Sequence, residues 1–147
     1  PKESPDAWVV EVVNTMKMGD CDKLEKLLTS FFASIPYSQR RKDDEREKER
    51  YFQYTFYLVI RMISSFTVLI EKEQSEGRVD CIIETPMFVY IFEFKRDGSA
   101  TEALKQIEEK GYAREYATDN RTIYLIGCNF SSKTGTIDDW KSKGKSV

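Results

Sequence analysis

The run FVYIFEFK at residues 88–95 constrains the fold of this chain more than any other segment. Successive side chains of a strand point to opposite faces, and here both sets are apolar except for Glu93 and Lys95. A strand that is apolar on both faces is typical of the centre of a sheet covered on both sides. The run therefore predicts a layered fold in which helices flank a central sheet.

Neighbouring segments supply the other strands of this predicted sheet. Residues 66–70 and 79–85 are rich in β-branched and apolar side chains and predict two preceding strands, while 122–128 predicts one that follows. The capping-box pattern Ser99-x-x-Glu102 predicts the start of a helix between the last two strands. A helical crossover of this kind favours parallel pairing of the strands that it joins.

Three helices are predicted before the first strand. Residues 6–18 and about 21–33 have apolar residues at helical spacing, and 49–63 is apolar nearly all round, which is typical of a buried helix. We expect an α/β fold with the core order helix, three strands, helix, strand, a mixed central sheet flanked by helices, and an N-terminal helical extension.

The two ends of the chain are predicted to differ from its centre. We interpret residues 1–38 as a helical connector from a missing upstream domain and residues 39–147 as the functional domain. The sequence starts at Pro1 without a leader, which we interpret as a fragment of a longer protein. The chain is polar from Asn129 onward, and we expect residues 141–147 to be frayed.

Histidine is absent from all 147 residues. Its absence excludes Ser-His-Asp hydrolysis, Cys-His nucleophiles and His-ligated zinc, so that catalysis would depend on carboxylates, Lys, Tyr, Cys or a bound metal. The three cysteines lie far apart, which argues against a disulfide framework and indicates a reducing, cytoplasmic setting. No apolar run approaches the roughly 18 residues of a membrane span.

The formal net charge of -2 predicts no strong global attraction to nucleic acid. Residues 39–50 carry six basic and five acidic side chains. We interpret this segment as a solvated helix face with ion pairs. The alternative is a nucleic-acid patch formed by Arg40, Arg41, Lys42 and Arg46.

The chemistry of this chain is predicted to lie at the end of the central strand. If Pro86 and Met87 form a two-residue loop, Asp80 lies opposite Glu93, and Lys95 follows on the same face of the sheet. Two carboxylates at that spacing repel unless a cation lies between them, and a hard divalent ion prefers such oxygens. The alternative is that Lys95 pairs with both carboxylates and that no metal binds.

The run Arg78-Val79-Asp80, a hairpin, and then Glu93-Phe94-Lys95 resembles the PD-(D/E)XK nuclease superfamily. The chain is most similar to nuclease domains at the C-terminus of bacterial proteins that begin with an AAA-ATPase-like domain. The resemblance spans about residues 24–140 and comprises, in order, FFASIPYS (31–38), the aromatic helix after Glu49, GRVD (77–80), YIFEFKRDGSATEALKQIEEKGY (90–112) and the stretch ending IGCNFSS (126–132).

This resemblance implies a restriction-endonuclease-like fold and a set of site residues. Asp80 and Glu93 would bind Mg²⁺ or Mn²⁺, and Glu49 would be an extra metal ligand. Lys95 would position or activate the attacking water or steady the phosphate. Gln106 would lie near the site, as a glutamine does in many members.

Two departures from the family pattern concern neighbouring positions. The proline that often precedes the motif Asp is Val79 here. Relatives with a Gln-x-x-x-Tyr pattern have Tyr where this chain has Lys110, and Tyr112 is displaced by two residues. The second departure bears on the assignment of Gln106.

Two functions compete at this point. The first is metal-dependent hydrolysis of phosphodiester bonds in nucleic acid, with DNA favoured over RNA. The second is a catalytically inactive module of the same fold that binds protein or nucleic acid for an upstream ATPase-like domain of the same protein. The intact acid-acid-lysine set favours the enzyme. No membrane partner is expected, and the oligomeric state is left open.

Overall fold

The structure is a computed structural model that describes residues 5–34, 68–73 and 79–145. Several predictions fall outside these ranges: the helix at 49–63 with Glu49, the basic residues 40–42 and 46, and the domain boundary at residue 38. They stay predictions.

A five-stranded sheet forms the centre of the described chain. Its strands lie side by side in sequence order, and only β3 and β4 are parallel. They are β1 (Val68–Glu73), β2 (Val79–Glu84), β3 (Phe88–Arg96), β4 (Thr122–Ser131) and β5 (Thr136–Lys145). The predicted central position of β3 is confirmed, because two strands flank it on each side and its residues from Val89 to Phe94 are all buried.

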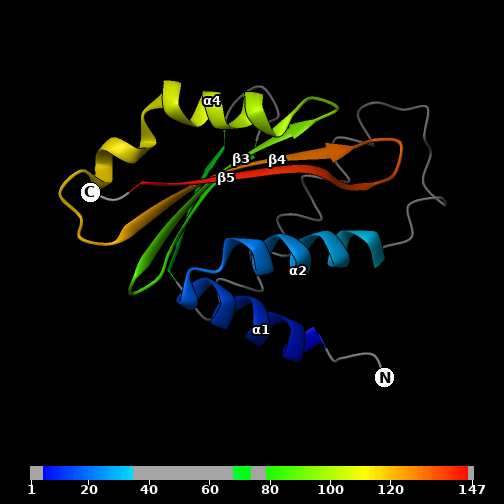
Figure 1. The fold of residues 1–147 in the computed structure, drawn as a ribbon, viewed down its shortest axis with the longest axis horizontal. Coiled ribbons are helices and arrows are strands. Elements are labelled where there is room, and N and C mark those ends of the chain that lie inside the picture. The colour runs from blue at the N-terminus through cyan, green and yellow to red at the C-terminus, as the bar shows by residue number, and fades with distance from the viewer. Residues whose placement is uncertain (1–4, 35–67, 74–78, 146–147) are drawn as a thin grey trace.

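Helices cover both faces of this sheet, as Figure 1 shows. Helix α4 (Ala100–Lys110) lies on one face, and α1 (Pro5–Met18) and α2 (Cys21–Ser34) lie on the other. A short 3-10 helix, Tyr112–Tyr116, follows α4. The predicted α/β class with a mixed sheet between helices is confirmed, and so is the parallel pairing across the α4 crossover. No helix in the described ranges is long and apolar enough to cross a membrane.

The boundaries of α4 follow from its local sequence. The Ser99 hydroxyl accepts a hydrogen bond from the Glu102 backbone N–H at 3.1 Å, which confirms the Ser99 half of the predicted capping box. At the other end, Gly111 adopts the left-handed conformation (φ 69°) and its N–H bonds to the Ile107 carbonyl. A residue without Cβ adopts this conformation at little cost, so the helix ends at Lys110.

Residues 136–145 form strand β5, so the prediction of a frayed segment was wrong for residues 141–145. Ile137 and Trp140 pack against the core on the α1–α2 face although they are three residues apart. A register shift in the β4–β5 pairing, in which Asp138 is the extra residue, allows both side chains to reach the same face. The exposed lysines Lys141 and Lys143 gave this edge strand its polar appearance.

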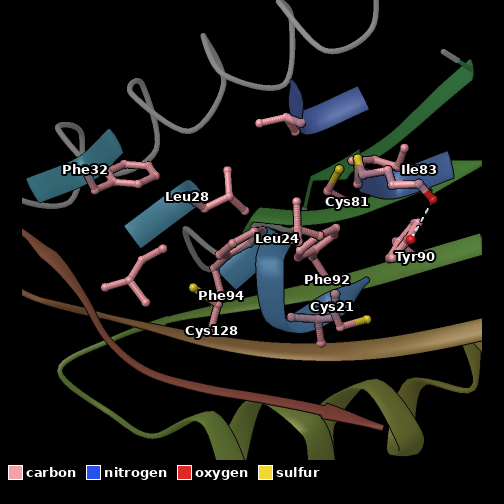
Figure 2. Close-up of a cluster of buried hydrophobic side chains, with 14 of the residues drawn as sticks. Cys21, Leu24, Leu28, Phe32, Cys81, Ile83, Tyr90, Phe92, Phe94 and Cys128 are labelled. Atoms are coloured by element: carbon pink, nitrogen blue, oxygen red, sulfur yellow. Dashed lines mark hydrogen bonds between the residues drawn. The ribbon is translucent and has the colours of Figure 1, made fainter. Parts of the chain in front are cut away.

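The main core lies between the sheet and helices α1 and α2 (Figure 2). The side chains drawn there include Leu24, Leu28 and Phe32 from α2 and Tyr90, Phe92 and Phe94 from β3. The first two helices therefore share a hydrophobic core with the sheet. A smaller cluster on the opposite face joins Val89 and Ile91 of β3 to Ile107 of α4. This is the face of the sheet that α4 covers.

The buried hydroxyl of Tyr90 ties this core to the end of α1. It donates a 2.7 Å hydrogen bond to the Met16 carbonyl (Figure 2). Tyr90→Phe keeps the ring packing and removes the donor, so we expect the free energy of unfolding to fall by about 1 kcal/mol in urea denaturation. Tyr124→Phe is the control, because it removes the hydroxyl of a less buried tyrosine whose ring stacks on that of Tyr90. Equal losses in both variants would contradict this assignment.

Candidate active site

The β2–β3 hairpin sets the geometry of the candidate site. Pro86 and Met87 form the loop, and the Thr85 N–H donates to the Phe88 carbonyl at 2.8 Å. Counting outward from this pair, the ladder places Asp80 directly opposite Glu93. The predicted register is confirmed. Directly opposed residues share a face of the sheet, with Cβ atoms about 4.5–5.5 Å apart.

Glu93 brings a carboxylate into the interior of the protein. Its side chain is 1% exposed, and its Oε1 accepts a 2.6 Å hydrogen bond from the Lys110 ammonium. The two groups form an ion pair, in which the Lys110 side chain is 18% exposed. Its other oxygen, Oε2, is buried and has no hydrogen-bond partner among the described residues. Burying an unpaired polar atom is costly, so a ligand for Oε2 would stabilise the site.

Lys95 lies two residues beyond Glu93, half-buried near the carboxyl end of β3. Strand alternation places both residues on the face that α4 covers, because Val89 and Ile91 of the same set pack against that helix. Their parallel partners on β4 are Gly127 and Asn129.

Gly127 allows α4 to approach the sheet beside Glu93. A Cβ at this position would lie 2.3 Å from the Ala100 carbonyl oxygen and 3.0 Å from the Leu104 nitrogen. Both are backbone atoms of α4, so only glycine permits this close packing. The helix that carries Lys110 is thereby held against the strand pair that carries Glu93.

A hydrogen-bond network fixes the turn between Lys95 and α4. The side chain of Asn129, which is 2% exposed, accepts from the Gly98 N–H and donates to an oxygen of Asp138, both at 2.8 Å. Asp139 accepts from the Ala100 N–H at 2.8 Å. The network links β4 and β5 to the first turn of α4. These positioning residues were not predicted, because they belong to the polar stretch that begins at Asn129.

Lys110 is the site residue that the sequence analysis did not assign. It appeared there only as a departure from the Gln-x-x-x-Tyr pattern. Gln106 is half-buried and lies four residues earlier on α4, and residues four apart share a helix face. Two sequence features could have indicated Lys110. A glutamate in the middle of a buried strand needs a cationic partner, and Lys110 is the lysine that lies four residues after Gln106 on the same helix face.

The cysteines take no part in this arrangement. Cys21, Cys81 and Cys128 are buried and form no disulfide among the described residues, as expected of small core residues. Burial raises the pKa of the Cys21 thiol to about 11 and the pKa of Cys128 well above its usual range. Both thiols therefore stay protonated and unreactive at neutral pH.

A divalent cation fits the residues at this site. The side chains of Asp80 and Glu49 lie outside those described, and within the rest no group of three or more His, Cys, Asp or Glu is arranged to hold a metal. The opposed acidic pair and the unpartnered Glu93 Oε2 offer the oxygen ligands that a hard cation prefers.

The mixed sheet with helices on both faces is consistent with a restriction-endonuclease-like α/β fold. A family model described as the PD-(D/E)XK nuclease superfamily matches residues 47–140, more than half of the chain. The chain belongs to this superfamily.

Comparison with curated proteins gives one similar protein, from Azotobacter chroococcum mcd 1, described as an "uncharacterized protein in vnfD 5'region". It is 32% identical over 129 residues, which cover 86% of this chain and 25% of that protein. The chain thus spans a quarter of the length of the curated relative that it matches. No solved structure matches this chain.

Proposed function

We propose that this chain is a metal-dependent nuclease that hydrolyses phosphodiester bonds in DNA. One observation carries the proposal: the ladder sets Asp80 opposite Glu93, and Lys95 follows two residues later on the same strand. Membership of the PD-(D/E)XK superfamily supports it. Fold alone does not establish an activity, so the proposal depends on these residues.

Each residue has a role in the proposed reaction. Asp80 and Glu93 supply oxygen ligands for Mg²⁺ or Mn²⁺, with Glu49 as a further ligand. The chemistry that such a cation supplies when bound is acidification of a water molecule and neutralisation of charge on the phosphate. Lys95 holds the attacking water or a phosphate oxygen through its ammonium group, and Gln106 supports the site from α4.

The setting of this activity is also proposed. The resemblance to C-terminal nuclease domains favours an ATPase-like segment upstream in the same protein, and a relative four times the length of the matched region is compatible with that arrangement. Three cysteines that form no disulfide among the described residues favour the cytoplasm, where cysteines stay reduced.

A cleavage assay tests the proposal. Single-stranded, duplex and branched DNA and matched RNA are incubated with Mg²⁺ or Mn²⁺, with and without a chelator. We expect DNA cleavage that needs the metal and that disappears in Asp80→Asn. Cleavage that persists with the chelator and in Asp80→Asn would contradict the proposal. DNA or protein binding without any cleavage would favour the inactive module instead.

A further inference from the structure

Two lysines of this candidate site come from different elements, Lys95 from β3 and Lys110 from α4, and only Lys95 is the motif lysine. Lys95 is the neighbour of Glu93 along β3, yet the ammonium that contacts Glu93 Oε1 at 2.6 Å belongs to Lys110, from the last turn of α4. The contact is largely shielded from water, because the Glu93 side chain is 1% exposed and that of Lys110 is 18% exposed. Such a pair is held by geometry and is screened little by salt.

The two oxygens of Glu93 are therefore in different states. Oε1 is neutralised by Lys110, whereas Oε2 is buried and has no hydrogen-bond partner in the part of the chain that is described. A carboxylate that binds two metal ions through separate oxygens needs both oxygens available to them. With Oε1 taken, Glu93 offers one oxygen, on the strand that pairs with Asp80.

We propose that Lys110 is a positioning residue that takes the place of a second metal ion at Glu93 and limits the site to one divalent cation. The inference rests on the proposed function, since it concerns the same acidic pair. Lys110 carries one fixed positive charge where a second cation would otherwise sit. It also holds the carboxylate so that Oε2 stays directed to the first cation.

The way in which α4 is anchored to the sheet supports a fixed contact between Lys110 and Glu93. Gly127 brings the helix backbone against β4, and the Asp139 carboxylate holds the Ala100 N–H at 2.8 Å. The left-handed Gly111 ends the helix immediately after Lys110. Helical side chains lean toward the N-terminus, so the Lys110 stem runs back along the helix toward the level of Glu93.

Isothermal titration calorimetry with Mn²⁺ on the full chain tests the inference. We expect the unmodified protein to bind one equivalent. Removing a unit charge beside the cation should raise the affinity for Mn²⁺ roughly tenfold or more, or admit a second equivalent. Lys110→Met and Lys110→Gln should both show this, and Lys110→Gln keeps a hydrogen-bond donor in case the Met variant fails to fold. Lys110→Arg should bind like the unmodified protein.

Lys105→Met is the matched control, because it removes an exposed lysine from the same helix. Binding of two equivalents of Mn²⁺ by the unmodified protein would overturn the inference. It would also be overturned if Lys110→Met and Lys110→Gln bind one equivalent with an affinity that is weaker than, or within threefold of, that of the unmodified protein. Asp80→Asn separates the two proposals. If binding is lost in Asp80→Asn but unaltered in the Lys110 variants, only the inference fails. If the unmodified protein binds no Mn²⁺, both fail.

Discussion

Lys95→Ala is expected to lower metal-dependent DNA cleavage by about 10²–10⁴-fold, the range typical of a group that positions or transfers a proton in the reaction. The lysine lies on the same strand and face as Glu93, so its loss removes the ammonium that is proposed to hold the attacking water while the acidic pair remains. Affinity for Mn²⁺ should change far less than the rate.

The control for this variant is Lys105→Ala, an exposed lysine of α4. It changes the net charge by the same amount and should leave the cleavage rate within about twofold, as a surface substitution outside the site. Rates measured at saturating metal, with folding checked by circular dichroism, separate a catalytic loss from unfolding. Lys95→Ala with a rate within threefold of the unmodified protein would refute the role of Lys95.

Gly127→Ala is expected to be the most destabilising single substitution at this site, at about 3 kcal/mol or more. The added Cβ would meet the Ala100 carbonyl at 2.3 Å, and a backbone atom cannot move aside without displacing α4. A displaced helix also carries Lys110 away from Glu93. Any folded population should therefore bind Mn²⁺ differently from the unmodified protein.

Gly144→Ala is the matched control for this effect. It lies on the neighbouring strand β5, and its Cβ would meet side-chain atoms of Tyr124, the nearest at 3.3 Å. We expect a loss below about 1 kcal/mol, because the ring can shift slightly. Urea denaturation compares the two variants, and similar midpoints for both would contradict the close packing of α4 on Gly127.

Local sequence predicted the parts of the site that depend on neighbours in the chain. The two-residue loop at Pro86 and Met87 fixed the register of Asp80 and Glu93, because a hairpin pairs residues by their distance from the loop. The Ser99 capping box fixed the start of α4 in the same way. The position of β3 followed from its apolar faces.

Features that depend on contacts distant in sequence could not be predicted in this way. The bulge in β5 breaks the alternation that would have identified Ile137 and Trp140 as core residues of a strand. The pairing of Lys110 with Glu93 depends on how closely α4 packs on the sheet. That distance is set by Gly127, which belongs to β4 and not to either of the elements that carry the pair. Periodicity along one segment does not report such contacts.

The most direct test of the metal site is a crystal structure of the protein grown with Mn²⁺, with anomalous data collected near the manganese edge. We expect one anomalous peak, bound by carboxylate oxygens of Asp80 and Glu93, with Lys110 still on Glu93 Oε1. No peak at millimolar Mn²⁺, or a peak away from this acidic pair, would contradict a metal-dependent active site at Asp80 and Glu93.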